Sequence, residues 1–148
     1  MYKKILIPLD NSPTDSVILN HIRPLAKINN AKLILVHVAD GYVARFQQPL
    51  NLADSEEITK DRQYLEAQKQ KLQSEGFEVK SYLLSGEPPK EILTIVEAER
   101  CDLIAMSTHG HRFLKDLIFG SVAENIRHRT DVPVLMIRAA KEENAAGA

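Results

Sequence analysis

Four short apolar runs and one loosely alternating run, Phe77–Leu84, lie between longer segments in which apolar residues recur at helical spacing. A short, continuous apolar run is typical of a strand that is buried on both faces. A stripe of apolar residues three or four positions apart indicates a helix with one face toward a core. We predict strands at Lys4–Leu9, Lys32–Val38, Phe77–Leu84, Asp102–Met106 and Val134–Ile137.

Cap residues, prolines and glycines suggest where the helices begin and end. The first follows Asn11–Thr14 and ends near Asn30, and Pro24 inside it predicts a kink or a break. The second starts at Ser55 and stops at Gly76. The others are a helix that begins at Pro88–Pro89, a short helical or irregular piece at 113–119, and a last helix over Ser121–Arg129.

Strict alternation of strands and helices predicts an α/β fold. We expect a five-stranded, mostly parallel, doubly wound sheet that is Rossmann-like, with helices on both faces. One domain would cover residues 1–140, and the polar segment 141–148 would be a disordered tail. Ligands bind such sheets at the carboxyl ends of the strands, where the strand order reverses. The site should therefore lie between the strands that lead to Asp10 and Ser107.

The segment that follows the fourth strand suits a phosphate group. It contains Gly110, and Gly120–Ser121 stands where the last helix is expected to start. Backbone N–H groups at a helix start lack partners within the helix, and the helix dipole favours an anion there. Glycine lets an anion approach closely, and Ser121 adds a hydroxyl. An ordinary strand–loop–helix corner would use the same residues, so both interpretations stay open at this point.

Composition narrows the class of protein. The 148 residues carry a net charge of −1 and 26% charged side chains, which favours a globular chain and argues against nucleic-acid or membrane binding. We expect a cytoplasmic location, because there is no signal-like or membrane-spanning run and only one cysteine. That residue, Cys101, is interpreted as a small core side chain.

The residues resemble the ATP-binding branch of the universal stress proteins, the UspA superfamily. The resemblance covers residues 1–138 and rests on Tyr2–Asp10, Leu35–Val38, Asp102–Ser121 and Asp131–Arg138. The nucleotide motif of that family is Gly, two residues, Gly, nine residues and then Gly-Ser or Gly-Thr. Here Ser107 replaces the first glycine, and the rest of the motif is in register. The resemblance also implies a fold like that of the adenine nucleotide alpha hydrolases.

The resemblance assigns roles at the adenine and ribose end. It implies that Pro8, Leu9 and Val38 border the adenine. Asp10 would accept a hydrogen bond from a ribose hydroxyl or lie near a metal. Asp10 and Ser121 could hold Mg²⁺ together with the phosphates, because oxygen ligands suit that ion.

The fourth strand and the segment after it would hold the rest of the nucleotide. Met106 and Ser107 would line the ribose, and the crowding or hydrogen bonding that Ser107 introduces is an open question. The residues implied to turn the chain toward the phosphates or to donate to them are Gly110, Gly120, Ser121 and Val122.

The remaining polar candidates do not form a catalytic group. His109 and His111 are interpreted as loop histidines beside the nucleotide, not as metal ligands. His37 is interpreted as a satisfied core or domain-face histidine, not as a catalyst. Neither a Walker A sequence nor a nucleophile elbow occurs. We expect at most slow ATP hydrolysis and assign no catalytic residue.

Three functions therefore remain. The first is an ATP-binding stress sensor or regulator with an unknown protein partner. The second is a nucleotide-free dimeric interaction module of the same fold, and the third is a slow ATP hydrolase. The apolar run Val134–Ile137 at a sheet edge invites pairing with a second copy, and the resemblance likewise implies a homodimer through this strand.

Overall fold

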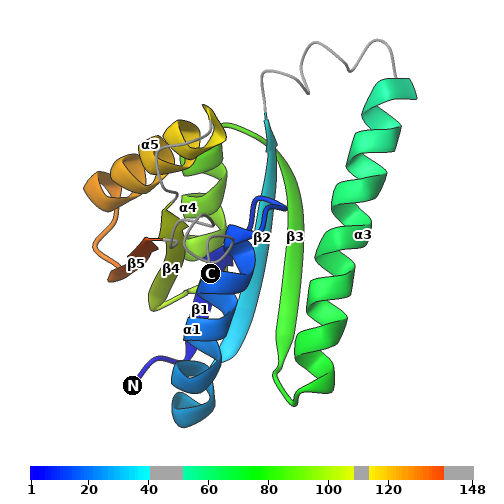
Figure 1. The fold of residues 1–148 in the computed structure, drawn as a ribbon. Coiled ribbons are helices and arrows are strands. Elements are labelled where there is room, and N and C mark those ends of the chain that lie inside the picture. Colours follow the sequence, from blue (N-terminus) through cyan, green and yellow to red (C-terminus); the bar gives the residue numbers. More distant parts are fainter. Residues whose placement is uncertain (41–51, 109–113, 139–148) are drawn as a thin grey trace, which may run out of the picture.

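The computed structural model describes residues 1–40, 52–108 and 114–138, which form five strands and four helices (Figure 1). The predicted alternation is confirmed, whereas the predicted tail at 141–148 lies outside the described residues. In chain order the elements are β1 (Lys4–Pro8), α1 (Thr14–Asn29), β2 (Lys32–Asp40), α3 (Leu52–Ser74), β3 (Val79–Gly86), α4 (Pro88–Glu99), β4 (Leu103–Thr108), α5 (Leu114–Arg129) and β5 (Val134–Arg138).

The strands form one parallel sheet, as predicted, and their order is β3-β2-β1-β4-β5. The chain moves outward from β1 to β3, returns across the sheet to β4 and then continues outward to β5. The strand order therefore reverses between β1 and β4, which are neighbours in the middle of the sheet. This is the switch point at which parallel sheets bind ligands.

Each face of the sheet carries its own hydrophobic core. Successive side chains of a strand point to opposite faces, so Ile5 and Ile7 join the cluster that contains residues of α1 and α3. Leu6 joins the cluster that contains residues of α4 and α5. Ile5, Leu6 and Ile7 are all fully buried, which explains why this strand is a continuous apolar run.

Two helix predictions need correction. Helix α1 continues through Pro24, so the predicted break does not occur. Helix α5 begins at Leu114, whereas the last helix was predicted to begin at Ser121. The segment before Ser121 contains leucine and lysine, which favour helix, and one glycine inside a helix costs only about 1 kcal/mol. Gly120 therefore does not end the helical run in this structure.

The earlier start of α5 changes the environment of the motif's last residues. Only about the first four N–H groups of a helix lack partners within it. Gly120, Ser121 and Val122 lie beyond that first turn of α5. The argument for free N–H groups at Gly120–Ser121 therefore does not hold for this conformation of α5.

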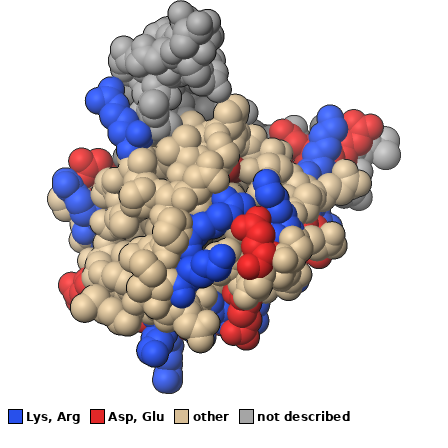
Figure 2. Space-filling model, turned by 60° about the horizontal axis from the view of Figure 1, so that its bottom comes forward, with Lys and Arg blue, Asp and Glu red and all other residues tan. Residues whose placement is uncertain are grey.

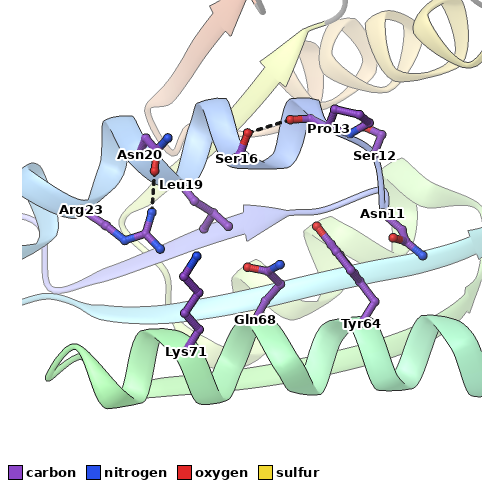
Figure 3. Close-up of a pocket in the computed structure, with 10 residues that line it drawn as sticks. All are labelled: Asn11, Ser12, Pro13, Ser16, Leu19, Asn20, Arg23, Tyr64, Gln68 and Lys71. Carbon is purple, nitrogen blue, oxygen red and sulfur yellow. Dashed lines mark hydrogen bonds between the residues drawn. The ribbon is translucent and has the colours of Figure 1, made fainter.

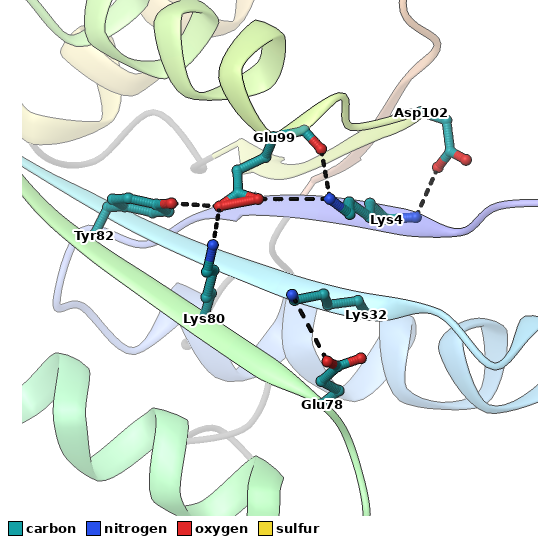
Figure 4. A network of polar contacts seen from close by, with 7 residues as sticks. All are labelled: Lys4, Lys32, Glu78, Lys80, Tyr82, Glu99 and Asp102. Carbon is teal, nitrogen blue, oxygen red and sulfur yellow. Dashed lines mark hydrogen bonds and ion pairs between the residues drawn. The ribbon is translucent and has the colours of Figure 1, made fainter.

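At the amino ends of the strands, a network of oppositely charged side chains links the sheet to α4. The buried carboxylate of Glu99, at the end of α4, accepts a hydrogen bond from Lys80 Nζ at 2.8 Å and one from the Tyr82 hydroxyl (Figure 4). Lys4 Nζ lies 3.5 Å from the same carboxylate. The hydrogen bonds from Lys80 and Tyr82 lower the pKa of Glu99 to about 2.

Asp102 ties β1 to the start of β4 at the same end. Its carboxylate accepts hydrogen bonds from the backbone N–H groups of Lys3, at 2.8 Å, and Lys4, at 3.1 Å. Viewed from this end, basic and acidic side chains lie next to one another (Figure 2). This intermixing indicates a structural role for these charges, because it leaves no broad field of one sign on the face shown.

Candidate functional site

The carboxyl ends of β1 and β4 lie side by side at the switch point. Leu6 pairs with Ile104 in parallel register, so the chain leaves both strands at the same edge of the sheet. Pro8, Leu9 and Asp10 lie at the end of β1, and Met106 and Ser107 lie near the end of β4. The structure thus brings together the described residues that were predicted from the two strands.

The backbone of the β1–α1 loop is held in place by hydrogen bonds. Leu9 N–H donates to the carbonyl oxygen of Val36 at 2.8 Å, and the Leu9 carbonyl oxygen lies 2.8 Å from Nδ1 of His37. Because a carbonyl oxygen can only accept, Nδ1 of His37 is the donor in this contact. Asn11 has a φ of 61°, a left-handed conformation that asparagine tolerates better than most residues. The loop therefore turns sharply directly after Asp10.

Asp15 holds this turn from within α1. Its carboxylate accepts the N–H group of Asp10 at 3.1 Å, the N–H group of Asn11 at 2.9 Å and the Tyr64 hydroxyl at 2.5 Å. The side chain of Asp15 is buried, and burial raises its pKa to about 6, with the nearby Asp10 charge acting in the same direction. The hydrogen bond from Tyr64 opposes this rise, and burial beside Asp15 raises the pKa of Tyr64 well above its usual value.

Asp10 is the carboxylate that the loop presents at the site. It is only half-buried, and its Oδ1 accepts a hydrogen bond from the Ser12 hydroxyl at 2.5 Å. The Ser12 hydroxyl also lies 2.8 Å from that of Thr14. A half-buried carboxylate at a switch point can accept hydrogen bonds from a ligand's hydroxyl groups or contribute an oxygen to a metal ion.

Ser107 fits its strand without strain. Its side chain is buried, as is that of Met106. The residues with positive φ in the described part of the chain are Asn11, Asn30, Arg100, Gly76 and Gly86. Position 107 is not among them, so it does not require a glycine here. The replacement of the first motif glycine is therefore compatible with the end of β4.

A separate groove of about 450 Å³ runs between α1 and α3 (Figure 3). Lys71 and Gln68 extend from α3 toward α1. The Arg23 guanidinium is already engaged by both carboxylate oxygens of Glu75 and by Asn20 Oδ1. The groove is lined at one end by Asn11, Ser12 and Pro13, so it reaches the loop that follows Asp10, and β4 contributes none of its lining residues.

A model of the universal stress protein family matches residues 1–138 of this chain. The chain belongs to the universal stress protein family. The match spans both strands of the switch point and the motif from Ser107 to Ser121. It therefore confirms the resemblance that the sequence motifs carry.

Individual universal stress proteins match over nearly the whole chain. MJ0577 of Methanocaldococcus jannaschii is 32% identical, and the match covers 93% of this chain and 96% of that protein. Its solved structure superimposes with a TM-score of 0.83 at 33% identity, over 95% of this chain and 99% of that one. YxiE of Bacillus subtilis is 28% identical over 93% of this chain and all of its own length.

Two solved universal stress proteins contain an adenine nucleotide. One, from Archaeoglobus fulgidus, is a complex with dAMP and has a TM-score of 0.68 at 21% identity, covering 92% of this chain and 98% of its own. Another is a complex with cAMP and has a TM-score of 0.67 at 17% identity, covering 94% and 98%. At these identities the likeness establishes the shared fold.

Some of the predicted nucleotide-binding residues of this universal stress protein lie in described strands and helices, and others lie outside the described residues. Val38 is half-buried near the end of β2 and packs against the core on the α4 and α5 face. Val122 is buried in that same core. Gly120 and Ser121 lie within α5, whereas Gly110, His109 and His111 lie outside the described residues.

Two other sequence interpretations are confirmed. His37 is buried, with Nδ1 near the Leu9 carbonyl oxygen and Nε2 3.2 Å from Asp61 Oδ2, as expected for a satisfied core histidine. Cys101 is buried in the core, where burial raises its pKa to about 11. Within the described ranges no helix could span a membrane and no group of three acidic, histidine or cysteine side chains could hold a metal.

Sequence reasoning missed three residues beside the site, namely Asp15, Asp61 and Tyr64. A usable signal was present for Asp61, because it lies on the inward side of the helix between Ile58 and Leu65. A charged residue on an otherwise apolar stripe indicates a buried polar partner.

Proposed function

We propose that this universal stress protein binds ATP between the carboxyl ends of β1 and β4 and acts as a nucleotide-dependent regulator. The observation that carries the proposal is that Asp10, after β1, and Ser107, in β4, lie at the switch point. Ser107 occupies the first position of the family's motif, and Gly110, Gly120 and Ser121 follow at the spacing of that motif. Asp10 would accept from the ribose hydroxyls. The loop that carries Asp10 is held by hydrogen bonds before any ligand arrives, which favours binding because little order must be imposed.

The adenine would lie against Pro8, Leu9 and Val38, with Met106 and Ser107 beside the ribose. Two universal stress proteins of the same fold hold dAMP and cAMP, which supports an adenine nucleotide as the class of ligand. Mg²⁺ bound to the phosphates would use an oxygen of Asp10 and the hydroxyl of Ser121. The carboxylate of Asp10 is a ligand type that Mg²⁺ prefers, and it is half-exposed.

The position of α5 favours a second candidate function. If α5 keeps its start at Leu114 in solution, Gly120, Ser121 and Val122 have no free N–H groups for phosphates. The protein would then be a nucleotide-free interaction module. ATP binding by the first function therefore requires the first turns of α5 to open, so that Gly120–Ser121 begins the helix.

The contents of the purified protein separate the two functions. The protein is denatured, and the released material is examined by ultraviolet absorbance and mass spectrometry, while calorimetry measures ATP binding. Gly120→Val should abolish binding, because a branched side chain blocks the phosphates. Glu124→Val is the matched control, since it places the same branched side chain at an exposed position of α5. If no nucleotide is released and ATP gives no heat of binding, the interaction module is favoured. Steady phosphate release would indicate the slow hydrolase.

We also propose that the protein forms a homodimer through β5. This strand is last in the sheet order, and Met136 is 39% exposed on it. Leu135→Pro removes a backbone N–H donor from the strand. Met136→Lys places two like charges opposite each other if the strands pair about a two-fold axis, so either change should weaken the dimer. Light scattering should show a wild-type dimer and a monomeric variant that still binds ATP. A wild-type monomer at micromolar concentration would contradict this assembly.

A further inference from the structure

Two side chains of α3 reach the loop that carries the proposed nucleotide site. Asp61 and Tyr64 are three residues apart, so they lie on the same side of the helix. Among the described side chains at 56–64, only Asp61, Tyr64 and Ile58 are not exposed. Both polar groups therefore face the body of the protein.

Asp61 contacts the loop directly and through a histidine. Its Oδ1 accepts a hydrogen bond from Asn11 Nδ2 at 3.3 Å, and its Oδ2 lies 3.2 Å from His37 Nε2. The other ring nitrogen of His37 donates to the carbonyl oxygen of Leu9. The side chains of His37 and Asp61 are 10% and 16% exposed, so water competes little for these contacts.

Tyr64 acts on the same loop through Asp15. Its hydroxyl donates to Asp15 Oδ2 at 2.5 Å. The two oxygens of Asp15 accept the backbone N–H groups of Asp10 and Asn11. The hydroxyl thus fixes the rotamer of the carboxylate that holds the turn, and it does so without touching the proposed nucleotide.

We propose that Asp61 and Tyr64 are positioning residues that couple the docking of α3 to the geometry of the nucleotide loop. Each contact ends on Leu9, Asp10 or Asn11, either directly or through one intermediate side chain. Coupling between two sites is reciprocal in free energy. A docked α3 therefore strengthens nucleotide binding, and bound nucleotide strengthens the docking of α3. This inference rests on the proposed ATP site.

ATP affinity and amide hydrogen exchange of α3 test the coupling on the full-length protein. Tyr64→Phe keeps the ring and removes one hydrogen bond, so it should weaken ATP binding about fivefold. Asp61→Ala should weaken binding by at least as much, and Asp61→Asn should recover part of the loss because its amide oxygen can still accept from Asn11. Lys60→Ala is the control, since Lys60 is exposed on the same helix. It should bind ATP like the wild type.

Hydrogen exchange distinguishes coupling from a purely structural role. ATP should slow the exchange of amides in α3 in the wild type and in Lys60→Ala, and this protection should disappear in a Tyr64→Phe, Asp61→Ala double variant that remains folded. If the wild type binds ATP but the variants bind equally well and α3 is not protected, the coupling is overturned and the ATP site stands. A wild type that does not bind ATP overturns the proposed function and this inference together.

Discussion

The two ends of the sheet treat a buried carboxylate in opposite ways. At the amino end, Glu99 is surrounded by the donors of Lys4, Lys80 and Tyr82, and its pKa falls to about 2. At the carboxyl end, Asp15 is buried beside another carboxylate, that of Asp10, and its pKa rises to about 6. The amino end stabilises the negative charge of Glu99, whereas at the carboxyl end burial makes the negative charge of Asp15 unfavourable.

This difference separates stability from function in the molecule. The donors around Glu99 connect α4, β1 and β3, and they stabilise its negative charge. The hydrogen bonds at the other end order the loop that follows β1 at the switch point. Groups with perturbed pKa values in unfavourable settings concentrate at functional sites. The contrast supports placing the site at the carboxyl end.

The largest expected effect comes from neutralising the carboxylate at the amino end. Glu99→Gln keeps the shape of the side chain but removes the charge shared by Lys4, Lys80 and Tyr82. Urea unfolding at neutral pH should show a loss of about 2 kcal/mol in the free energy of unfolding. Glu78→Gln is the matched control, because Glu78 is 76% exposed and its pair with Lys32 spans 3.7 Å. A loss equal to that of the control would mean that the Glu99 network contributes little.

The pH dependence of stability should show opposite signs for the two carboxylates. The pKa of Glu99 is lowered from 4.5 to about 2, so its contribution is present above pH 4.5 and is lost as the pH falls toward 2. The pKa of Asp15 is raised from 3.8 to about 6, so its contribution is full below pH 3.8 and is lost as the pH rises toward 6.

Urea unfolding of three proteins across this range measures both contributions. The stability difference between wild type and Glu99→Gln should shrink as the pH falls below 4.5. Relative to Asp15→Asn, the wild type should be more stable at pH 3.8 than at pH 6. Each change has an upper limit of about 1.4 kcal/mol per pH unit. Parallel curves for all three proteins would contradict the opposite signs.

The smallest effect is expected for a pair that belongs to neither end. Arg23 of α1 and Glu75, the residue after α3, form a bidentate ion pair, with side chains 22% and 33% exposed. Water and salt screen such a pair, so Arg23→Met should cost no more than about 1 kcal/mol, and less at high salt. Thermal unfolding at two salt concentrations checks this. A cost as large as that of Glu99→Gln would remove the distinction between buried and exposed carboxylates.

The fold could be predicted from the sequence because a parallel sheet leaves a simple trace. Strands such as β1 are buried on both faces, so Ile5, Leu6 and Ile7 form a continuous apolar run that alternates with amphipathic helices. The alternation alone does not give the strand order, and Asp10 and Ser107 were placed together because the phosphate-like segment follows the fourth strand.

The contacts around the site could not be predicted in the same way. Tyr64 and Asp15 are 49 positions apart, and their hydrogen bond depends on how α3 packs beside α1. The start of α5 was predicted incorrectly at Ser121, because Gly120–Ser121 has the composition of a helix start. The residues before it also favour helix, and α5 begins at Leu114. Local preference was balanced there, so the sequence alone does not decide the boundary.

The central position of β1 has a consequence for the order in which the protein is synthesised. β1 pairs with β2, which starts at Lys32, and with β4, which starts only at Leu103. During synthesis one edge of β1 can therefore be paired early, while its other edge stays without its native neighbour until most of the chain has left the ribosome. Asp102, which accepts the N–H groups of Lys3 and Lys4, arrives just before that neighbour. The nascent chain thus carries an apolar, half-paired strand for most of its synthesis, and this stage is the one most exposed to aggregation.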